Sequence, residues 1–307
     1  MHSFDEMTNL SKELRENLTR DFFINPISID LLQKSTDGTI KNGVKLHDGL
    51  MVESVLIPTE SRSTACVSSQ VGCSLNCEFC ATAKLKRMRN LEVAEIVDQV
   101  ALIDRQSKEY FDRPLTNIVF MGMGEPMMNY KNVVEAIHKI TKPEGLGMSP
   151  RRITVSTSGI PKMIKMLADE EIKVKLALSL HSAIEHKRND IMPFSEKFPL
   201  TDIMDSLQYW YQKTGSPITF EYCVWKGIND GDDDIKALIR YCRQVPSKVN
   251  LIQYNPIGEG KFDHRSISAE EKYVRELEKA GITIMVRKSR GGDIDAACGQ
   301  LANKTAE

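Results

Sequence analysis

The sequence predicts an α/β fold with a mostly parallel sheet. Strand-like and helix-like segments alternate six times along the chain, and a last strand-like segment at 281–288 closes the series. Such alternation predicts parallel strands, because each helix returns the chain to the starting edge of the next strand. Six units can form a doubly wound sheet or a barrel, complete or partial, and the pattern alone does not decide between them. No G-x-G-x-x-G motif follows the first strand, which weakens a dinucleotide-binding fold.

The elements are expected in the following order. Residues 1–45 are mostly polar and carry one short helical pattern, in which Leu10, Leu14 and Leu18 follow a Thr8 cap. Residues 35–43 are typical of turns, and a strand is expected at 50–58. The alternating units come next, each a strand followed by a helix: 64–71 and 91–106, 116–122 and 130–140, 152–158 and 160–170, 173–180 and 200–212, 218–225 and 232–245, 248–254 and 268–281.

Composition indicates a globular protein of the cytoplasm. Charged residues make up 27% and hydrophobic residues 41% of the 307 residues, which is ordinary for a protein with a substantial core. No run of 18 apolar residues exists, and the first residues lack the apolar region of a secretory signal. In the reducing cytoplasm the seven cysteines are expected to be ligands, catalysts or core residues. Because the formal net charge is only -1, a nucleic acid would have to be held by local basic clusters.

Four of the seven cysteines lie within "CVSSQVGCSLNCEFC", and three of them form a C-x-x-x-C-x-x-C motif at Cys73, Cys77 and Cys80. A structural zinc site usually has four ligands in two spaced pairs, and this loop lacks a second pair. Three thiolates can instead hold a cubane iron–sulfur cluster and leave one iron open to substrate. A zinc knuckle or chance clustering is the competing interpretation. Other unusual segments, "GMGEP", "STSG", "SLH" and "YNP", also fall at predicted strand ends, where sites of parallel sheets lie.

Taken together, these motifs resemble a known family. The cysteine loop after a first barrel strand is similar to that of the radical S-adenosylmethionine superfamily. The longer string "CVSSQVGCSLNCEFCATA", with the four segments above and "DIDAACGQL", resembles its branch of dual-specificity methyltransferases, which methylate carbon 2 of an adenosine in 23S rRNA and in certain tRNAs. The resemblance runs from about Met7 to Ala302. It implies a partial (β/α)6 radical-SAM barrel at 46–307 with a C-terminal catalytic tail, and a short helical and β extension at 1–45 that is the remnant of an N-terminal accessory region.

The resemblance implies the cofactors and their ligands. Cys73, Cys77 and Cys80 would hold a 4Fe-4S cluster whose open iron binds S-adenosylmethionine. An electron from a donor such as a flavodoxin-type reductant would then cleave the cofactor to a 5′-deoxyadenosyl radical. Gly124 would let the backbone approach the cofactor, and Glu125 would meet its ammonium group. The resemblance implies further contacts to S-adenosylmethionine from Ser156, Ser179, Leu180, His181 and Asn255.

The resemblance also implies a covalent route. Cys298 would accept a methyl group from one S-adenosylmethionine, and the radical from a second would activate that carbon for addition to adenine. Two molecules of S-adenosylmethionine would therefore be used per turnover. Cys66 would release the product by thiol–disulfide exchange, and Glu53 matches the family's proton acceptor. From the residues alone, Cys66 is as readily a buried strand cysteine and Glu53 a half-exposed polar residue. Cys223 and Cys242 match no catalytic motif and are expected in the core.

Two other functions stay open at this point. The first is the related antibiotic-resistance branch, which methylates carbon 8 of the same adenosine. The second is a non-enzymatic RNA-binding protein with a structural zinc. Two basic clusters are expected to flank the pocket mouth and contact RNA phosphates, with solvated surface charge as the alternative: Lys84, Lys86, Arg87 and Arg89, and Arg287, Lys288 and Arg290.

Overall fold

A computed structural model describes residues 3–258, residue 262 and residues 267–303 of the chain. Its main feature is a ten-stranded sheet in the order β1-β2-β3-β4-β7-β8-β9-β10-β11-β12. Each strand from β4 onward pairs in parallel with the next, in the order of the sequence. These parallel strands are β4 (Ser63–Cys66), β7 (Asn117–Phe120), β8 (Ile153–Thr157), β9 (Lys175–Ser179), β10 (Ile218–Cys223), β11 (Ser247–Ile252) and β12 (Thr283–Arg287).

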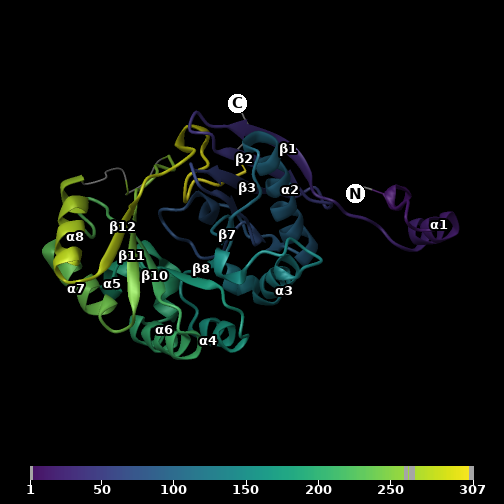
Figure 1. Cartoon of the computed structure of the whole chain (residues 1–307). Coiled ribbons are helices and arrows are strands. Elements are labelled where there is room, and N and C mark those ends of the chain that lie inside the picture. Colours follow the sequence, from purple (N-terminus) through teal and green to yellow (C-terminus); the bar gives the residue numbers. More distant parts are fainter. Residues whose placement is uncertain (1–2, 259–261, 263–266, 304–307) are drawn as a thin grey trace.

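Helices connect the parallel strands on the outer side of the sheet. They are α2 (Val93–Phe111), α3 (Tyr130–Thr141), α4 (Pro161–Asp169), α6 (Leu200–Thr214), preceded by the short α5 (Glu185–Ile191), α7 (Asp232–Cys242) and α8 (Ile267–Lys279). Right-handed crossovers that always advance in one direction place their helices on one face. In Figure 1 the long connecting helices follow the outside of a curved sheet. A doubly wound sheet would need a reversal of strand order, so the sequential order confirms the predicted partial barrel.

Successive side chains on these strands have different surroundings. Val155 and Phe220 point outward and are buried under the helices, at 1% and 0% exposure. Their neighbours in the chain, Ser156 and Glu221, point inward and line a cavity. Neighbouring residues of a strand face opposite sides, so the apolar core lies between sheet and helices while the inner face is free to carry polar groups.

Three antiparallel strands extend the sheet beyond β4. β1 (Ser28–Lys34), β2 (Ile40–Lys45) and β3 (Met51–Pro58) pair in order, and β3 also pairs with β4. The expectation of turns at 35–43 is wrong from Ile40 onward, because β2 lies between two strands and buries Ile40 and Val44. Turn and bend conformations are confined to residues 36–38 of that segment.

The strand expected at 64–71 is broken in the structure. β4 ends at Cys66, and a separate β5 (Gln70–Val71) pairs with β6 (Arg89–Asn90) in a two-stranded sheet. Ser68 lies at the break, where its hydroxyl donates to the Glu53 carbonyl at 2.5 Å and accepts from the Met123 N–H at 2.8 Å. These bonds turn the chain out of the main sheet and into the cysteine loop.

The first helix, α1 (Lys12–Asp21), stands apart from the sheet in Figure 1, and none of its residues is buried. It begins later than expected, because Ser11 rather than Thr8 is its N-cap and accepts from the Leu14 N–H at 3.2 Å. Neither α1 nor any other described helix is long and apolar enough to cross a membrane.

The different surroundings of α1 and α3 can be tested by two substitutions. Ile137 in α3 is fully buried (0% exposed), whereas Leu14 in α1 is 44% exposed. Ile137→Ala should lower the free energy of unfolding by about 2–5 kcal/mol, because it removes buried carbon atoms and leaves a cavity. Leu14→Ala should change it by less than about 0.5 kcal/mol. Chemical denaturation measures both values, and equal losses would contradict the placement of these helices.

Candidate active site

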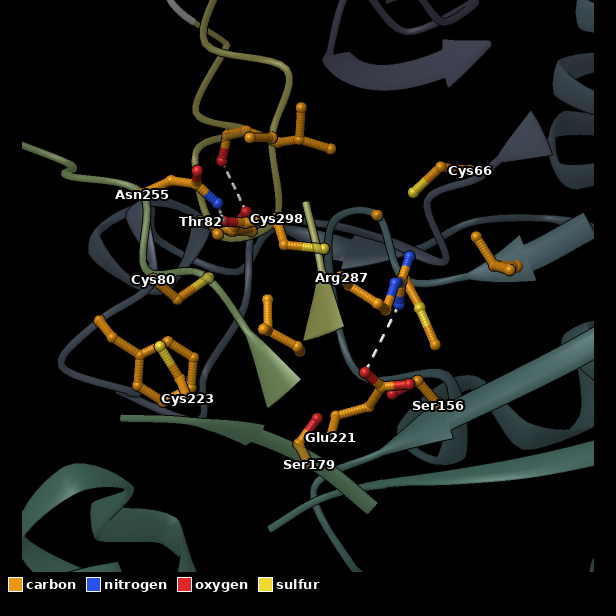
Figure 2. Close-up of a pocket in the computed structure, with 18 of the residues that line it drawn as sticks. Cys66, Cys80, Thr82, Ser156, Ser179, Glu221, Cys223, Asn255, Arg287 and Cys298 are labelled. Atoms are coloured by element: carbon orange, nitrogen blue, oxygen red, sulfur yellow. Dashed lines mark hydrogen bonds and ion pairs between the residues drawn. The ribbon is translucent and has the colours of Figure 1, made fainter. Parts of the chain in front are cut away.

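A cavity of about 430 Å³ opens at the carboxyl ends of the parallel strands. Six of the seven cysteines line it: Cys66, Cys73, Cys77, Cys80, Cys223 and Cys298. Figure 2 shows side chains from the strands, the cysteine loop and the C-terminal tail directed toward this common space. The seventh, Cys242, is buried in α7, as predicted. Cys223 is also buried, but it reaches the cavity wall, which the sequence did not suggest.

The cysteine loop, residues 72–80, is held at both ends by backbone contacts. Gly72 has a φ of +73°, and a Cβ there would meet the Lys86 carbonyl oxygen at 2.3 Å, so only glycine fits this turn. The Glu78 N–H donates to the Ile191 carbonyl at 3.1 Å, and the Ala81 N–H donates to the Gly299 carbonyl at 2.7 Å. The loop is therefore fixed between the end of α5 and the C-terminal tail.

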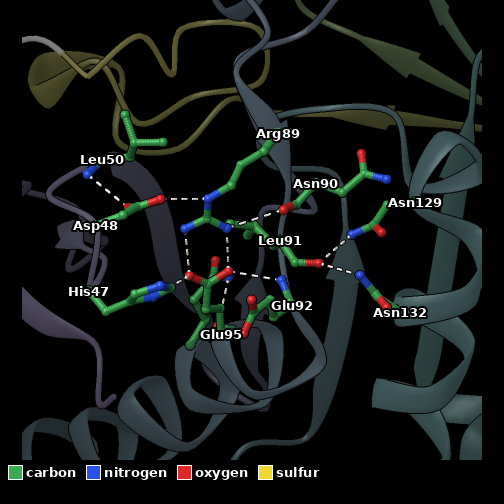
Figure 3. A network of polar contacts seen from close by, with 11 residues as sticks. His47, Asp48, Leu50, Arg89, Asn90, Leu91, Glu92, Glu95, Asn129 and Asn132 are labelled. Carbon is green, nitrogen blue, oxygen red and sulfur yellow. Dashed lines mark hydrogen bonds and ion pairs between the residues drawn. The ribbon is translucent and has the colours of Figure 1, made fainter.

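A polar network braces the segment that follows the loop (Figure 3). The Arg89 guanidinium lies 2.7 Å from Asp48 and 2.7 Å from Glu95, and Glu95 also accepts from the Glu92 N–H at the start of α2. His47 lies 3.5 Å from the same Glu95 carboxylate. These carboxylates raise the pKa of Arg89 above its usual range. Arg89 is thus bound within the protein, and the basic cluster expected to meet RNA does not present it as a free phosphate contact.

The three loop cysteines are a thiolate donor set that fits an iron–sulfur cluster. Among the described residues, no three cysteine, histidine, aspartate or glutamate side chains converge on one point. A cubane binds each cysteine through a different iron, so its ligands surround a cluster instead of converging. Burial raises the pKa of the Cys73 thiol to about 11 and also raises those of Cys77 and Cys80. Thiolates in this loop are therefore favoured only beside a compensating positive charge, which the iron of a cluster would supply.

Arg188 provides a second indication of an anionic group at this place. It is fully buried, and its Nε and Nη1 atoms have no hydrogen-bond partner among the described residues. Its Nη2 donates to the Ser158 carbonyl, and its charge acts to lower the pKa of Cys77. A buried cation is costly without a compensating negative charge. A cluster held by three thiolates would supply that charge.

Phe79 and His181 close one side of the cavity. Their rings pack with centroids 4.5 Å apart, and both also contact Trp225. His181 has a φ of +55°, and its Nδ1 accepts from the Cys223 N–H at 3.2 Å. Burial lowers the pKa of His181 to about 3, so its ring is neutral at physiological pH. Its other ring nitrogen, Nε2, then carries the proton and can donate to a bound ligand.

The residues of "GMGEP" lie at the end of β7, where the prediction placed them. Both oxygens of the buried Glu125 carboxylate accept backbone N–H groups, from Met127 at 3.0 Å and from Ser158 at 2.8 Å. Burial raises the pKa of Glu125 while these bonds oppose the rise. Gly124 has a φ of +93°, and a Cβ there would meet Gln70 at 2.5 Å. The close approach at Gly124 is therefore to Gln70, although both Gly124 and Glu125 also line the cavity.

The other predicted cofactor contacts are placed unequally. Ser156, Ser179, His181 and Asn255 line the cavity, but Leu180 does not, because its side chain is fully buried in the core. Any contact from Leu180 would have to come from its backbone. The Asn255 amide donates to the Cys298 carbonyl at 3.2 Å, so this residue also positions the tail (Figure 2).

Cys298 and Cys66 face the cavity from the tail and from the end of β4. Cys298 is exposed to the cavity, while Cys66 is 7% exposed. The surrounding protein raises the pKa of both thiols, to about 12 for Cys66, where burial is the larger cause and Cys298 adds to it. Arg287 lowers the pKa of both thiols, and a hydrogen bond with the Met121 backbone also lowers that of Cys66.

Glu53 lies outside the cavity lining. It is 2% exposed on β3, where it lies 3.3 Å from the Lys41 ammonium group and accepts the Ala302 N–H at 2.7 Å. In this structure Glu53 therefore anchors the C-terminal tail. Its expected part in proton transfer stays a prediction.

The sequence interpretation missed an ion pair inside the cavity. Arg287, expected at the rim, lies 3.4 Å from Glu221, and Asn250 donates to the same carboxylate at 2.9 Å. Figure 2 shows the pair among the other side chains that line the cavity. A signal was present, because Glu221 is the single charged residue of the strand segment "ITFEYCVW".

This fold and site define the class of the protein. A model of the Radical SAM superfamily matches residues 67–242, which contain the cysteine loop, and the chain belongs to that superfamily. The crystal structure of a radical SAM methyltransferase from Sphaerobacter thermophilus superposes with a TM-score of 0.94 at 39% identity, over 99% of this chain and 89% of that chain.

Curated relatives identify the branch. The chain is 67% identical over 305 residues to the probable dual-specificity RNA methyltransferase RlmN of Christiangramia forsetii, covering 99% of this chain and 87% of the relative. It is 43% identical over 302 residues to the dual-specificity RNA methyltransferase RlmN of Geotalea uraniireducens, covering 98% and 86%. The chain belongs to the RlmN family and is a radical SAM RNA methyltransferase. A non-enzymatic zinc protein is thereby excluded.

The role of the loop cysteines can be tested by iron content. Cys73→Ala, Cys77→Ala and Cys80→Ala should each lose most bound iron and the visible absorption of the cluster, because two thiolates do not hold it stably. Cys242→Ala is the matched control, since Cys242 is buried in α7 away from the cavity lining. Iron and sulfide assays after anaerobic reconstitution measure the effect. Normal iron content in any of the three variants would remove that cysteine from the ligand set.

Proposed function

We propose that this enzyme methylates carbon 2 of an adenosine in 23S rRNA and in tRNA, with Cys298 carrying the methyl carbon and Cys66 releasing the product. One observation carries the proposal. Cys66 and Cys298, from opposite ends of the barrel sequence, line the same cavity as Cys73, Cys77 and Cys80. Membership of a dual-specificity RNA methyltransferase family supports two kinds of RNA substrate.

The chemistry explains why two thiols are needed besides the cluster ligands. The C2–H group of adenine is neither acidic nor nucleophilic, so a direct methyl transfer cannot act on it. When bound, a 4Fe-4S cluster and two molecules of S-adenosylmethionine supply a methyl group and a hydrogen-abstracting radical, which no side chain offers. Cys298 sulfur accepts the methyl group as a thiolate and holds the carbon next to the adenine. Once the radical has removed a hydrogen atom from this methyl group, the carbon can bond to C2 of adenine, and the adduct loses the C2 proton and one electron, for which the oxidised cluster would be the acceptor. The protein then stays covalently joined to RNA until Cys66 attacks the Cys298 sulfur.

Other residues hold the reactants. Cys73, Cys77 and Cys80 would hold the cluster, and a flavodoxin-type protein would be its electron donor. Glu125, Ser156, Ser179 and Asn255 line the wall where S-adenosylmethionine would bind, with His181 as a neutral hydrogen-bond donor. Glu53 is kept as the proton acceptor, and it would reach substrate only after its bond to the Ala302 N–H is released.

RNA binding is assigned to exposed cations of the two basic clusters. Lys84, Lys86 and Lys288 are exposed, whereas Arg89 and Arg287 pair with carboxylates. Phosphate contacts give affinity without sequence specificity. The choice of nucleotide therefore falls to the cavity.

The position of methylation separates this proposal from the carbon 8 alternative. Anaerobic turnover with 23S rRNA fragments and with tRNA should give 2-methyladenosine in both, because one cavity serves both substrates. Digested RNA compared by mass spectrometry with 2- and 8-methyladenosine standards measures the product. Detection of 8-methyladenosine alone would assign the enzyme to the antibiotic-resistance branch.

The role of Cys66 predicts a trapped species. Cys66→Ala should still methylate Cys298 but then accumulate a protein–RNA adduct that survives denaturant and disappears with ribonuclease, because release needs the second thiol. Cys298→Ala should form neither adduct nor product. Cys242→Ala serves as the control for removal of a buried cysteine. Normal turnover of Cys66→Ala without adduct would make Cys66 a core residue.

A further inference from the structure

The Arg287 guanidinium lies inside the cavity, where it forms an ion pair with the Glu221 carboxylate. The Glu221 carboxylate is 4% exposed, while the Arg287 side chain is 36% exposed toward the cavity. Asn250, directly beside Glu221 in the register of β10 and β11, donates to the carboxylate at 2.9 Å. The carboxylate is therefore fixed on the wall, and it holds the guanidinium in place in the open space (Figure 2).

Both thiols of the proposed route line the same cavity as this guanidinium. The charged and titratable groups that act on Cys298 are Arg287 on β12, Glu221 on β10 and Cys80 in the loop, and those that act on Cys66 are Arg287 and Cys298. Arg287 is in turn affected by both cysteines. Other cations of the cavity lining, Arg62, Lys288 and Arg290, are not among the groups that act on either thiol.

Each thiol must carry a negative charge at one step. Cys298 loses its proton, and its sulfur takes CH₃ from the sulfonium as that S–C bond breaks and a neutral thioether leaves. Later, Cys66 sulfur forms an S–S bond to Cys298 as the C–S bond to the product breaks. The electron pair of that bond passes to the carbon, which takes a proton, and a dithiol reductant then restores the thiols. A thiolate in a buried site is unfavourable unless a cation compensates it.

We propose that Arg287 is a positioning residue that stabilises the thiolate of Cys298 and, once that sulfur has been methylated, the thiolate of Cys66. The inference rests on the proposed function. One guanidinium faces both thiols, and a charged Cys298 disfavours the ionisation of Cys66, so Cys66 ionises more readily once Cys298 no longer carries a charge. Methylation turns Cys298 into a neutral thioether and leaves the charge of Arg287 to Cys66. The thiol that releases the product is thereby activated only after the carbon has been loaded.

Alkylation by iodoacetamide tests this inference without S-adenosylmethionine or RNA. The reconstituted enzyme is alkylated anaerobically over a range of pH, and mass spectrometry of peptides follows Cys66 and Cys298 separately. Arg287→Gln should move both pH profiles to higher pH and slow both reactions at fixed pH. A loss of about threefold is expected per unit of pKa, because a more basic thiolate is also more nucleophilic. Arg287→Lys should retain most of the wild-type rate.

Two further variants make the test independent of folding defects in Arg287→Gln. Glu221→Gln should accelerate alkylation of Cys298, the opposite direction, because it removes a neighbouring negative charge. Cys298→Ser should accelerate alkylation of Cys66, and that gain should disappear in the double variant with Arg287→Gln. Lys288→Gln is the matched control, one residue further along the chain, and should leave both profiles unchanged.

The outcomes separate this inference from the proposed function. Unchanged profiles in Arg287→Gln, or an equal effect of Lys288→Gln, would overturn the inference even if Cys298 is methylated normally. Slower alkylation of Cys66 in Cys298→Ser would overturn the order of activation. Failure to find a methyl group on Cys298 after incubation with S-adenosylmethionine would refute the proposed function instead, whatever the alkylation rates are.

Discussion

The two-residue period of the parallel strands is the constraint on which the rest of this molecule depends. On β10, Phe220 and Tyr222 are buried in the core, while Glu221 and Cys223 face the cavity. The helices can cover only the outer face, because every crossover advances in the same direction. No described helix therefore packs against the inner face of the sheet. It carries serine, glutamate, arginine and cysteine side chains around an open volume instead of the apolar layers that fill a closed barrel.

The C-terminal tail covers this inner space. It is bound to the segment directly after the cysteine loop, where Thr82 donates to the Leu301 carbonyl at 2.6 Å, and to β3 through Glu53. It is also bound to the turn between β1 and β2, because Ser35 donates to Asp293 at 2.6 Å and Asp37 accepts the Gly291 N–H at 2.9 Å. The N-terminal strands therefore support the segment that carries Cys298. Their place in the sheet gives the extension a structural role at the site.

Several of the buried charges act on the site or on the tail that covers it. Lys41 and Glu53, at 3% and 2% side-chain exposure, form a pair beneath the tail, and removal of one partner from such a pair typically costs about 3–5 kcal/mol. Arg287 and Glu221 form a second pair among the thiols. Arg188 has no such partner among the described residues and faces the cluster loop. This arrangement places positive charge where thiolates and an anionic cluster are required.

Much of the fold and of the site could be predicted from the sequence, since the signals concerned are local. Alternating strand and helix patterns determined a parallel α/β fold, the spacing of Cys73, Cys77 and Cys80 indicated a metal centre, and the helix expected at 130–140 is α3, which buries Val133 and Ile137. Only the tertiary structure decided that all crossovers advance in one direction and that the strand breaks at Ser68. It also decided that Arg89 pairs with two carboxylates and that Arg287 points into the cavity. These outcomes depend on which strands become neighbours. Whether Arg287 is a cation at the rim or a counter-ion inside the cavity depends on whether Glu221, which is far away in the sequence, lies beside it. The spacing of residues along the sequence does not give that information.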